Sequence, residues 1–102
     1  MCGLVGWLAG DGDARRQAEE LTKAATALTH RGPDDEGVFF DGEIGLAFRR
    51  LSILDLTQAG HQPMTSANGQ WTVVFNGEIY NFVEIRRDLE ALGVQFRGTG
   101  DT

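Results

Sequence analysis

The sequence has few of the residues that mark several common classes of protein. Its 102 residues include one cysteine and two prolines, and 15 acidic against 9 basic side chains give a formal net charge of −6. A single cysteine excludes a disulfide-stabilised scaffold, and the acidic balance argues against a nucleic-acid-binding surface. No apolar run reaches the length of a membrane span or of a signal-peptide core. These absences indicate a cytoplasmic protein that binds neither nucleic acid nor a membrane.

Common phosphate-binding and metal-binding patterns are also absent. The sequence contains no G-x-x-x-x-G-K-[ST] loop, no G-x-G-x-x-G between a strand and a helix, and no cysteine pair. Its two histidines, His30 and His61, form no H-x-x-x-H pattern, so we interpret His30 as a residue that positions the loop at 31–34 through its backbone. No metal ion and no cofactor are therefore expected on this chain. With 41% hydrophobic and 24% charged residues, it has the composition of one folded domain.

The first half of the sequence predicts a strand, a helix and a hairpin. Residues 2–8 form a short apolar run that ends at a glycine-containing turn, as is typical of a buried strand. Asp41-Gly42 predicts a hairpin turn between strands at 38–40 and 44–48. A helix is predicted from an N-cap at Asp13 to Thr29. Its inner face has four apolar residues at helical spacing: Leu21, Ala24, Ala25 and Leu28.

The second half predicts another hairpin, a second helix and a final strand at 94–96. Residues 56–63 show no periodicity and are expected to form an ordered loop, and Asn68-Gly69 predicts a hairpin turn ahead of a strand at 71–75. The helix is expected from an N-cap at Asn81, with a capping box completed by Glu84 and with Gly93 at the C′ position. The whole pattern indicates an α+β domain with mainly antiparallel pairing. The inward stripe of this second helix consists of Phe82, Ile85, Leu89 and Leu92.

Cys2 is the residue that most suggests catalysis. When the initiator methionine is removed, as is usual before a small residue, the Cys2 thiol lies beside a free α-amine. Such an amine titrates near pH 7.7–8.0, so that about a tenth to a third of it is an unprotonated base at neutral pH. It can accept the thiol proton through a water molecule and return it to a leaving group. One residue then supplies nucleophile and base; the alternative is an inert, buried thiol with Met1 retained.

Asn76-Gly77 can supply the hydrogen-bond donors that acyl transfer requires. The side-chain amide of Asn76 and the backbone N–H of Gly77 can converge on one oxygen atom, and glycine lets a substrate approach the backbone closely. Asn-Gly after a strand is also the usual sequence of a type I′ hairpin turn. Residues 78–81 resemble the start of a capped helix more than a return strand, which weakens the hairpin interpretation without excluding it.

Three charged residues can fix the two ends of an amino-acid substrate. Arg50 follows the predicted strand at 44–48, and a guanidinium can hold a carboxylate through two parallel hydrogen bonds. Glu78 and Asp101 can receive an α-ammonium group. Each residue taken singly can equally be a solvated surface charge, and that is our interpretation of Arg49.

Six short motifs occur in order along the chain: Met1-Cys2-Gly3, His30-Arg31-Gly32-Pro33-Asp34, Arg50-Leu51-Ser52-Ile53, Ala59-Gly60-His61-Gln62-Pro63-Met64, Asn76-Gly77-Glu78-Ile79-Tyr80-Asn81 and Gly100-Asp101-Thr102. Together they resemble the glutaminase domain of glutamine-hydrolysing asparagine synthetases, which are class II glutamine amidotransferases. The resemblance covers the whole chain. Related amidotransferases that make glucosamine 6-phosphate or phosphoribosylamine share the N-terminal cysteine but typically differ in the RLSI, AGHQPM and NGEIYN stretches.

The resemblance implies a role for each matching residue. Cys2 would attack the side-chain amide of L-glutamine to form a glutamyl thioester and release ammonia, and water would then yield glutamate. The family commonly has a serine at the position of Gly100, a departure that concerns the loop geometry next to Asp101. Asn76 and Gly77 would form the oxyanion hole and contact glutamine. The α-ammonium of glutamine would be bound by Glu78 and Asp101. Its α-carboxylate would be bound by Arg50, with help from Leu51, Ser52, Ile53 and Leu54.

The resemblance also implies the fold and the setting of the domain. The fold would be a four-layer α/β/β/α sandwich of the N-terminal-nucleophile hydrolase type, and residues 1–102 would supply roughly its first half. A synthetase domain, absent from this sequence, would bind ATP and Mg²⁺ and use the ammonia to make asparagine from aspartate. The alternatives are an amidotransferase for another acceptor, such as a sugar or a surface-polymer precursor, and a truncated, catalytically silent interaction module. A homodimer is compatible with the sequence.

Overall fold

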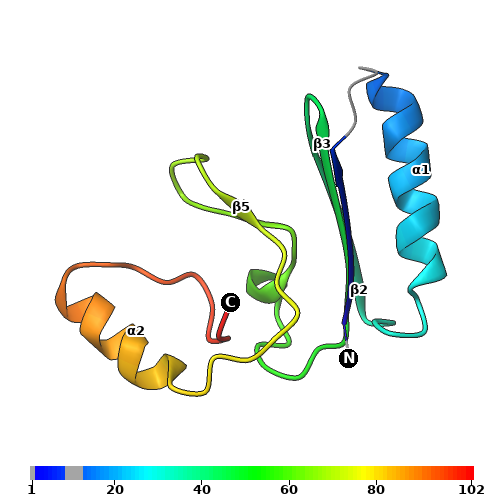
Figure 1. Ribbon diagram of the computed structural model, residues 1–102. Coiled ribbons are helices and arrows are strands. Elements are labelled where there is room, and N and C mark those ends of the chain that lie inside the picture. The colour runs from blue at the N-terminus through cyan, green and yellow to red at the C-terminus, as the bar shows by residue number, and fades with distance from the viewer. Residues whose placement is uncertain (1, 9–12) are drawn as a thin grey trace.

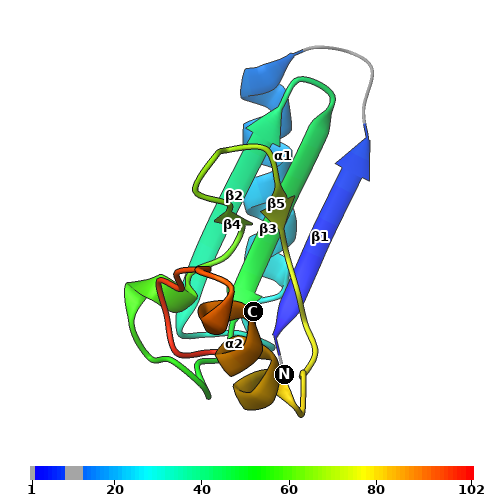
Figure 2. The same cartoon turned by 90° about the vertical axis from the view of Figure 1, so that its left-hand side faces the viewer.

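The computed structural model describes residues 2–8 and 13–102, and within them two antiparallel sheets lie between two helices (Figure 1). Helix α1 covers one face of the three-stranded sheet, whose strand order is β1-β3-β2. The two-stranded sheet β4-β5 and helix α2 lie on the other side, as Figures 1 and 2 both show. The elements are β1 (Gly3–Leu8), α1 (Ala14–Ala27), β2 (Asp35–Asp41), β3 (Ile44–Arg50), the short 3₁₀ helix η1 (Gln58–Gly60), β4 (Met64–Thr65), β5 (Thr72–Val73) and α2 (Phe82–Ala91).

Helix α1 forms where the sequence predicts it and ends two residues earlier, at Ala27. The Asp13 carboxylate accepts the N–H of Arg16 over 3.1 Å, which confirms the predicted N-cap. On the inner face, Leu21 and Ala25 are fully buried, whereas Ala24 and Leu28 are half-buried. The core that they build is completed by Ala47 of β3 and by the partly buried Val5, Trp7 and Phe40. This core fixes the three-stranded sheet on which the candidate site is built.

The register of the three-stranded sheet brings the predicted nucleophile, Cys2, close to the predicted carboxylate-binding residue, Arg50. Strand β1 pairs antiparallel with β3, and Gly3 lies opposite Arg49. The start of β1 therefore lies beside the end of β3. The predicted hairpin between β2 and β3 is confirmed, with Gly42 and Glu43 as the two loop residues, one position later than the pair singled out in the sequence. Gly42 has a φ of 57°, which glycine adopts at no steric cost.

The second predicted hairpin is also confirmed, but its strands are shorter than expected. Gly69 lies in the turn with a φ of 71°, and β5 covers Thr72–Val73 instead of 71–75. The reason is that the backbone N–H and C=O of Phe75 bind the side chain of Gln62 rather than a neighbouring strand. The predicted loop at 56–63 contains η1 and no other regular element.

Helix α2 begins and ends close to its predicted limits, and Gly93 at its C′ position has a φ of 90°. Asn81 occupies the N-cap position but its side chain makes no capping hydrogen bond, so the predicted capping box is wrong. The inward stripe is wrong as well, because no residue of α2 is buried and Leu92 is 81% exposed. The segment 94–96 is not a strand. The predicted stripe and the predicted strand both depend on packing against another element, and no described helix or strand buries a residue of α2. Neither described helix has the length and apolar character needed to span a bilayer.

Candidate active site

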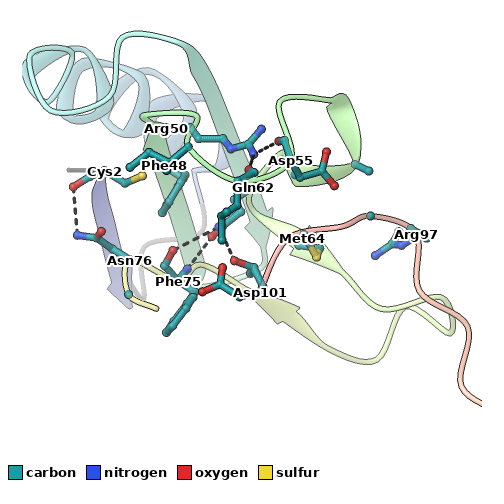
Figure 3. Close-up of a pocket in the computed structure, with 18 of the residues that line it drawn as sticks. Cys2, Phe48, Arg50, Asp55, Gln62, Met64, Phe75, Asn76, Arg97 and Asp101 are labelled. Atoms are coloured by element: carbon teal, nitrogen blue, oxygen red, sulfur yellow. Dashed lines mark hydrogen bonds between the residues drawn. The ribbon is translucent and has the colours of Figure 1, made fainter. Parts of the chain in front are cut away.

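Most of the predicted site residues line one cavity of about 680 Å³ (Figure 3). They come from the segment before β1, the end of β3 with the loop after it, the segment between β5 and α2, and the last residues of the chain. Small-molecule sites typically have volumes of about 300–1,000 Å³, so an amino acid can be accommodated. Nine of the ten predicted residues line the cavity, namely Cys2, Arg50, Leu51, Ile53, Leu54, Asn76, Gly77, Glu78 and Asp101.

Ser52 is the predicted residue that does not line this cavity. Its backbone N–H donates to the carboxylate of Asp34 over 2.8 Å. Asp34 in turn donates its own N–H to the carbonyl of Arg50 over 3.0 Å. The loop after α1 therefore holds the start of the segment 51–54 from behind.

The thiol and the carbonyl of Cys2 are both fixed by residues that are distant in the sequence. The backbone N–H of Leu51 donates to Sγ over 3.3 Å, and the thiol faces the Leu51 carbonyl at 3.7 Å. The carbonyl of Cys2 accepts the Nε–H of Arg31 and the Nδ2–H of Asn76, each over 3.1 Å. Cys2 is half-buried, and its thiol points into the cavity (Figure 3). The predicted removal of Met1 concerns a residue outside the described part of the chain.

Asn76 and Gly77 lie beside Cys2 and do not form a hairpin turn. A type I′ turn requires a positive φ at both residues, and neither has one. The chain instead continues toward α2, so the hairpin interpretation is wrong. One N–H of the Asn76 amide is used by the Cys2 carbonyl, and an amide NH₂ group has a second one. A Cβ on Gly77 would lie 2.8 Å from Cζ of Phe75, so a side chain there would require the Phe75 ring to shift.

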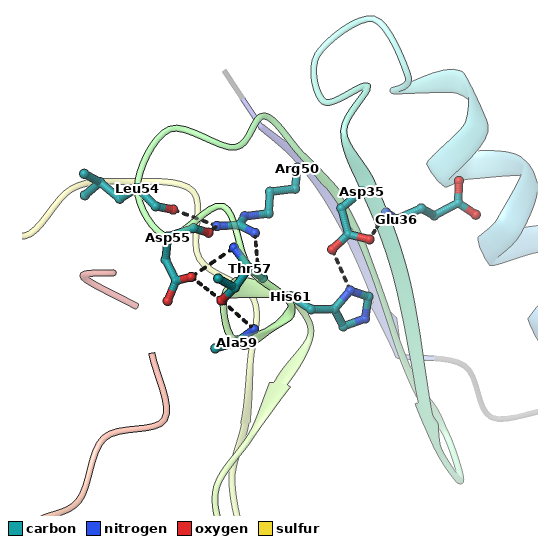
Figure 4. Close-up of polar contacts among 8 residues, drawn as sticks. All are labelled: Asp35, Glu36, Arg50, Leu54, Asp55, Thr57, Ala59 and His61. Atoms are coloured by element: carbon teal, nitrogen blue, oxygen red, sulfur yellow. Dashed lines mark hydrogen bonds and ion pairs between the residues drawn. The ribbon is translucent and has the colours of Figure 1, made fainter. Parts of the chain in front are cut away.

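Arg50 is buried, with 8% of its surface exposed, and its guanidinium binds the loop that follows β3 (Figure 4). Nη1 donates to the carbonyl of Thr57 over 3.2 Å, and Nη2 donates to the carbonyls of Leu54, over 2.7 Å, and Asp55. Gly60 packs on the guanidinium, since a Cβ there would lie 2.2 Å from Nη2. Arg50 is therefore not a solvated surface charge. Both N–H groups of Nη2 are already used by the carbonyls of Leu54 and Asp55. A substrate carboxylate that is held by two parallel N–H groups of the guanidinium must therefore displace one of these carbonyls.

Asp101 and Glu78 are brought to the same side of the cavity. The carboxylate of Asp101 accepts the N–H of Ile79, the residue after Glu78, over 2.8 Å. Glu78 is exposed and lines the cavity. Two acidic residues in this part of the cavity lining favour a cationic group there.

Arg49 is not a free surface charge, contrary to the sequence interpretation. Its Nε donates to the carbonyl of Gly32 over 2.9 Å, its Nη1 forms an ion pair with Glu36, and 11% of its side chain is exposed. Neighbouring residues of a strand point to opposite faces, so Arg49 and Arg50 brace different loops. The loop at 31–34 is held by Arg31 and Asp34, and no hydrogen bond of His30 is found among the described contacts. Our interpretation of His30 is therefore not supported.

Asp55 is a site residue that the sequence analysis missed. It adopts a φ of 51°, and its carboxylate accepts the N–H of Thr57 over 3.1 Å and the Thr57 hydroxyl. The second oxygen accepts the N–H of Thr99 over 2.6 Å. The hydrogen bond from the Thr57 hydroxyl, together with those from the two backbone N–H groups, lowers the pKa of Asp55 from 3.8 to about 2. The signal in the sequence was the Asp-x-Thr spacing, which favours such a turn.

Gln62 was quoted within a motif but was given no role of its own. Only 5% of its surface is exposed. Its Oε1 accepts the N–H of Phe75 over 2.6 Å, and its Nε2 donates to the carbonyl of Phe75 over 3.3 Å and to the hydroxyl of Thr102 over 3.4 Å (Figure 3). No pattern in the sequence distinguishes such a buried loop glutamine from an exposed one.

Comparison with known proteins gives the family. A family model described as "Glutamine amidotransferase domain" matches residues 1–102. Asparagine synthetase [glutamine-hydrolyzing] 1 of Bacillus subtilis (strain 168) is 42% identical over 107 residues, which cover 100% of this chain and 16% of that protein. Asparagine synthetase [glutamine-hydrolyzing] 2 of the same organism is 43% identical over 103 residues, with coverage of 99% and 13%. A putative asparagine synthetase of Methanocaldococcus jannaschii is 38% identical over 104 residues, with coverage of 84% and 20%.

These relatives are much longer than the region they share with this chain, which spans 16% and 13% of the two B. subtilis proteins. The resemblance predicted from the six motifs is confirmed at the level of the family. From the match over its full length, this chain belongs to the glutamine amidotransferase domain family.

Proposed function

We propose that this chain carries a glutamine-hydrolysing site in which Cys2 is the nucleophile. The observation that carries the proposal is the cavity itself. The residues predicted from their side-chain chemistry and from the family motifs come from four separate segments, and nine of these ten residues line one cavity of about 680 Å³. The half-buried Cys2 thiol faces that space, so a substrate within it can reach the sulfur.

The reaction needs no group beyond this chain, glutamine and water. The sulfur of Cys2 bonds to the side-chain carbonyl carbon of glutamine while the α-amine takes the thiol proton. The amine returns that proton to the amide nitrogen, the carbon–nitrogen bond breaks and ammonia leaves. Water then cleaves the thioester to give glutamate and the free thiol. The second N–H of the Asn76 amide and the N–H of Gly77 stabilise the negative oxygen of each tetrahedral intermediate.

The remaining residues orient glutamine by its two charged ends. Glu78 and Asp101 form the negative side of the cavity and bind the α-ammonium. Arg50 and the backbone of 51–54 bind the α-carboxylate, which replaces a loop carbonyl on the guanidinium. Binding of both charged ends fixes the α-carbon of glutamine, so that its side-chain amide can be directed at Cys2.

The arrangement of layers supports a proposal for the fold of the whole domain. Helix α1, the three-stranded sheet, the two-stranded sheet and α2 follow one another across the molecule (Figure 1). This is the order of a four-layer α/β/β/α sandwich of the N-terminal-nucleophile hydrolase type. The incomplete cover of α2 is consistent with the chain supplying about half of that fold.

For the whole protein we propose transfer of the ammonia to aspartate, because the relatives named above are glutamine-hydrolysing asparagine synthetases. ATP and Mg²⁺ would bind outside this chain. The test incubates the purified protein with L-glutamine and quantifies ammonia and glutamate, which are expected in equal amounts. Asparagine formed only with aspartate, ATP and Mg²⁺ would identify the acceptor. Ammonia without asparagine would favour another acceptor, and a folded protein that releases no ammonia would be the silent module.

A further inference from the structure

We infer that Gln62 is a positioning residue, which holds Asn76 and Gly77 beside Cys2 through the backbone of Phe75. The kinetic part of this role rests on the proposed function. Gln62 itself lines the cavity, but its described side-chain hydrogen bonds go to Phe75 and Thr102 and not to Cys2, Asn76 or Gly77. Its side chain is buried, with 5% of the residue exposed, and its polar atoms are directed at the segment that precedes the oxyanion donors (Figure 3).

The Gln62 amide binds the backbone N–H and C=O of Phe75, which a neighbouring strand would bind in a sheet. Oε1 accepts the Phe75 N–H over 2.6 Å, and Nε2 donates to the Phe75 carbonyl over 3.3 Å. Both backbone groups of one residue are thus bound by one side chain, as in a sheet pair, but at a single position. The strand pairing ends at Val73, and the chain leaves Phe75 in the direction that places Asn76 at the Cys2 carbonyl.

The same amide also contacts the last residues of the chain. A second N–H of Nε2 is directed at the hydroxyl of Thr102, at 3.4 Å. Thr102 follows Asp101, the residue proposed to bind the α-ammonium. One buried side chain therefore contacts two of the segments that contribute site residues.

The backbone of Gln62 is itself fixed on the three-stranded sheet. A Cβ on Gly37 of β2 would lie 2.0 Å from the Gln62 carbonyl oxygen, so the two backbones are in direct contact. His61, the preceding residue, lies with Nδ1 2.6 Å from a carboxylate oxygen of Asp35 at the start of β2 (Figure 4). The sheet contacts the backbone of Gln62, and the Gln62 side chain binds the backbone of Phe75, the residue before Asn76. Through these two contacts the sheet helps to fix the position of Asn76. Catalytic groups held from a rigid element in this way are more precisely placed than groups on an unsupported loop.

Two substitutions separate positioning from simple packing. Gln62→Met keeps most of the volume and removes all three hydrogen bonds. Gln62→Glu keeps an acceptor for the Phe75 N–H but places a carboxylate oxygen opposite the Phe75 carbonyl, and it supplies a second variant if the methionine variant does not fold. Gln70→Met is the matched control, because Gln70 is exposed in the β4-β5 hairpin and its side chain accepts a hydrogen bond from Asn68 in that turn.

The first measurement is amide hydrogen exchange at Phe75 and Asn76, which needs no turnover. Both amides are expected to exchange faster in the Gln62 variants and at the original rate in Gln70→Met. Unchanged exchange in Gln62→Met and Gln62→Glu would overturn the inference. This measurement decides the role of Gln62 even if the unsubstituted protein releases no ammonia, a result that would refute the proposed function alone.

The second measurement is glutamine hydrolysis. An oxyanion donor acts in the transition state, so kcat is expected to fall by about 10²-fold in Gln62→Met while KM changes little. Since Gln62 acts through Asn76, the double variant Gln62→Met/Asn76→Ala is expected to be no slower than Asn76→Ala. Fully multiplicative losses, or a loss confined to thermal stability, would show that Gln62 is only a packing residue.

Discussion

The backbone N–H of Leu51 lies 3.3 Å from Sγ of Cys2, although 49 positions separate the two residues in the sequence. The contact follows from the antiparallel pairing of β1 with β3, in which Gly3 is opposite Arg49. Leu51 is also the first residue after Arg50. The proposed nucleophile and the proposed carboxylate-binding segment are thus fixed relative to each other by one strand pair.

Asn76→Ala is expected to lower kcat for glutamine hydrolysis by about 10²–10³-fold, because it removes the proposed donor to the developing oxyanion. KM is expected to change little, since the substrate amide in the ground state gains less from that donor. Steady-state kinetics on purified protein measures both quantities. A lower melting temperature with unchanged kcat would mean that Asn76 serves only to hold the Cys2 carbonyl.

Arg50→Lys is expected to raise KM for glutamine and to loosen the loop after β3. An ammonium cannot reproduce the planar fork that binds three carbonyls at once, and Thr57 and Leu54 would lose their donors. Kinetics and hydrogen exchange over 54–57 test the two effects separately. Arg87→Lys on the exposed side of α2 is the control. Faster exchange without a change in KM would show that Arg50 binds the loop and not the substrate.

Gly60→Ala is expected to destabilise the fold by about 1–3 kcal/mol, as overpacking of a well-packed site usually does. The new Cβ would lie 2.2 Å from Nη2 and 2.6 Å from Cζ of Arg50, whose guanidinium is buried and held by carbonyls. Gly6→Ala is the matched control, because its Cβ would lie 3.2 Å from Cδ2 of Leu46, the end of a flexible side chain, and 3.9 Å from the Gly45 carbonyl oxygen, an ordinary contact. Chemical denaturation gives both values, and equal stability of the two variants would contradict the tight packing at Gly60.

Asp55 is expected to make the loop after β3 sensitive to acid. Its pKa is lowered from 3.8 to about 2, so its stabilising contribution is complete above pH 4 and is lost as the pH falls toward 2. Asp55→Asn keeps a residue that tolerates the positive φ but removes the charge and one acceptor. Exchange of the Thr99 amide between pH 5 and pH 2 is expected to depend on pH, beyond its intrinsic rate, in the unsubstituted protein and hardly at all in Asp55→Asn. Identical profiles would contradict the link between Asp55 and Thr99.

Local signals in the sequence predicted much of this fold. The N-cap at Asp13 and the buried positions Leu21 and Ala25 were predictable, because capping and helical periodicity depend on neighbouring residues. The turn glycines at 42, 69 and 93 were predictable for the same reason, since each has a positive φ. The candidate site residues followed from side-chain chemistry and from the family motifs.

The rest depended on contacts between distant segments. The hydrogen bonds of Gln62 to Phe75 cannot be read from either segment alone, and they shorten β5 against its own β-propensity. Arg49 and Arg50 are chemically identical neighbours, and only the pleat of β3 decides that each braces a different loop. The stripe on α2 was periodic, yet periodicity does not supply the element that would cover it.

Ammonia release from L-glutamine by Cys2→Ala decides whether Cys2 is the nucleophile. The intact mass of the unsubstituted protein is determined first and is expected to lack the initiator methionine, since the α-amine of Cys2 must be free to act as the base. With Met1 absent, the unsubstituted protein is expected to release ammonia and glutamate in equal amounts, and Cys2→Ala is expected to release none above background. Undiminished ammonia release by Cys2→Ala would contradict the proposed mechanism.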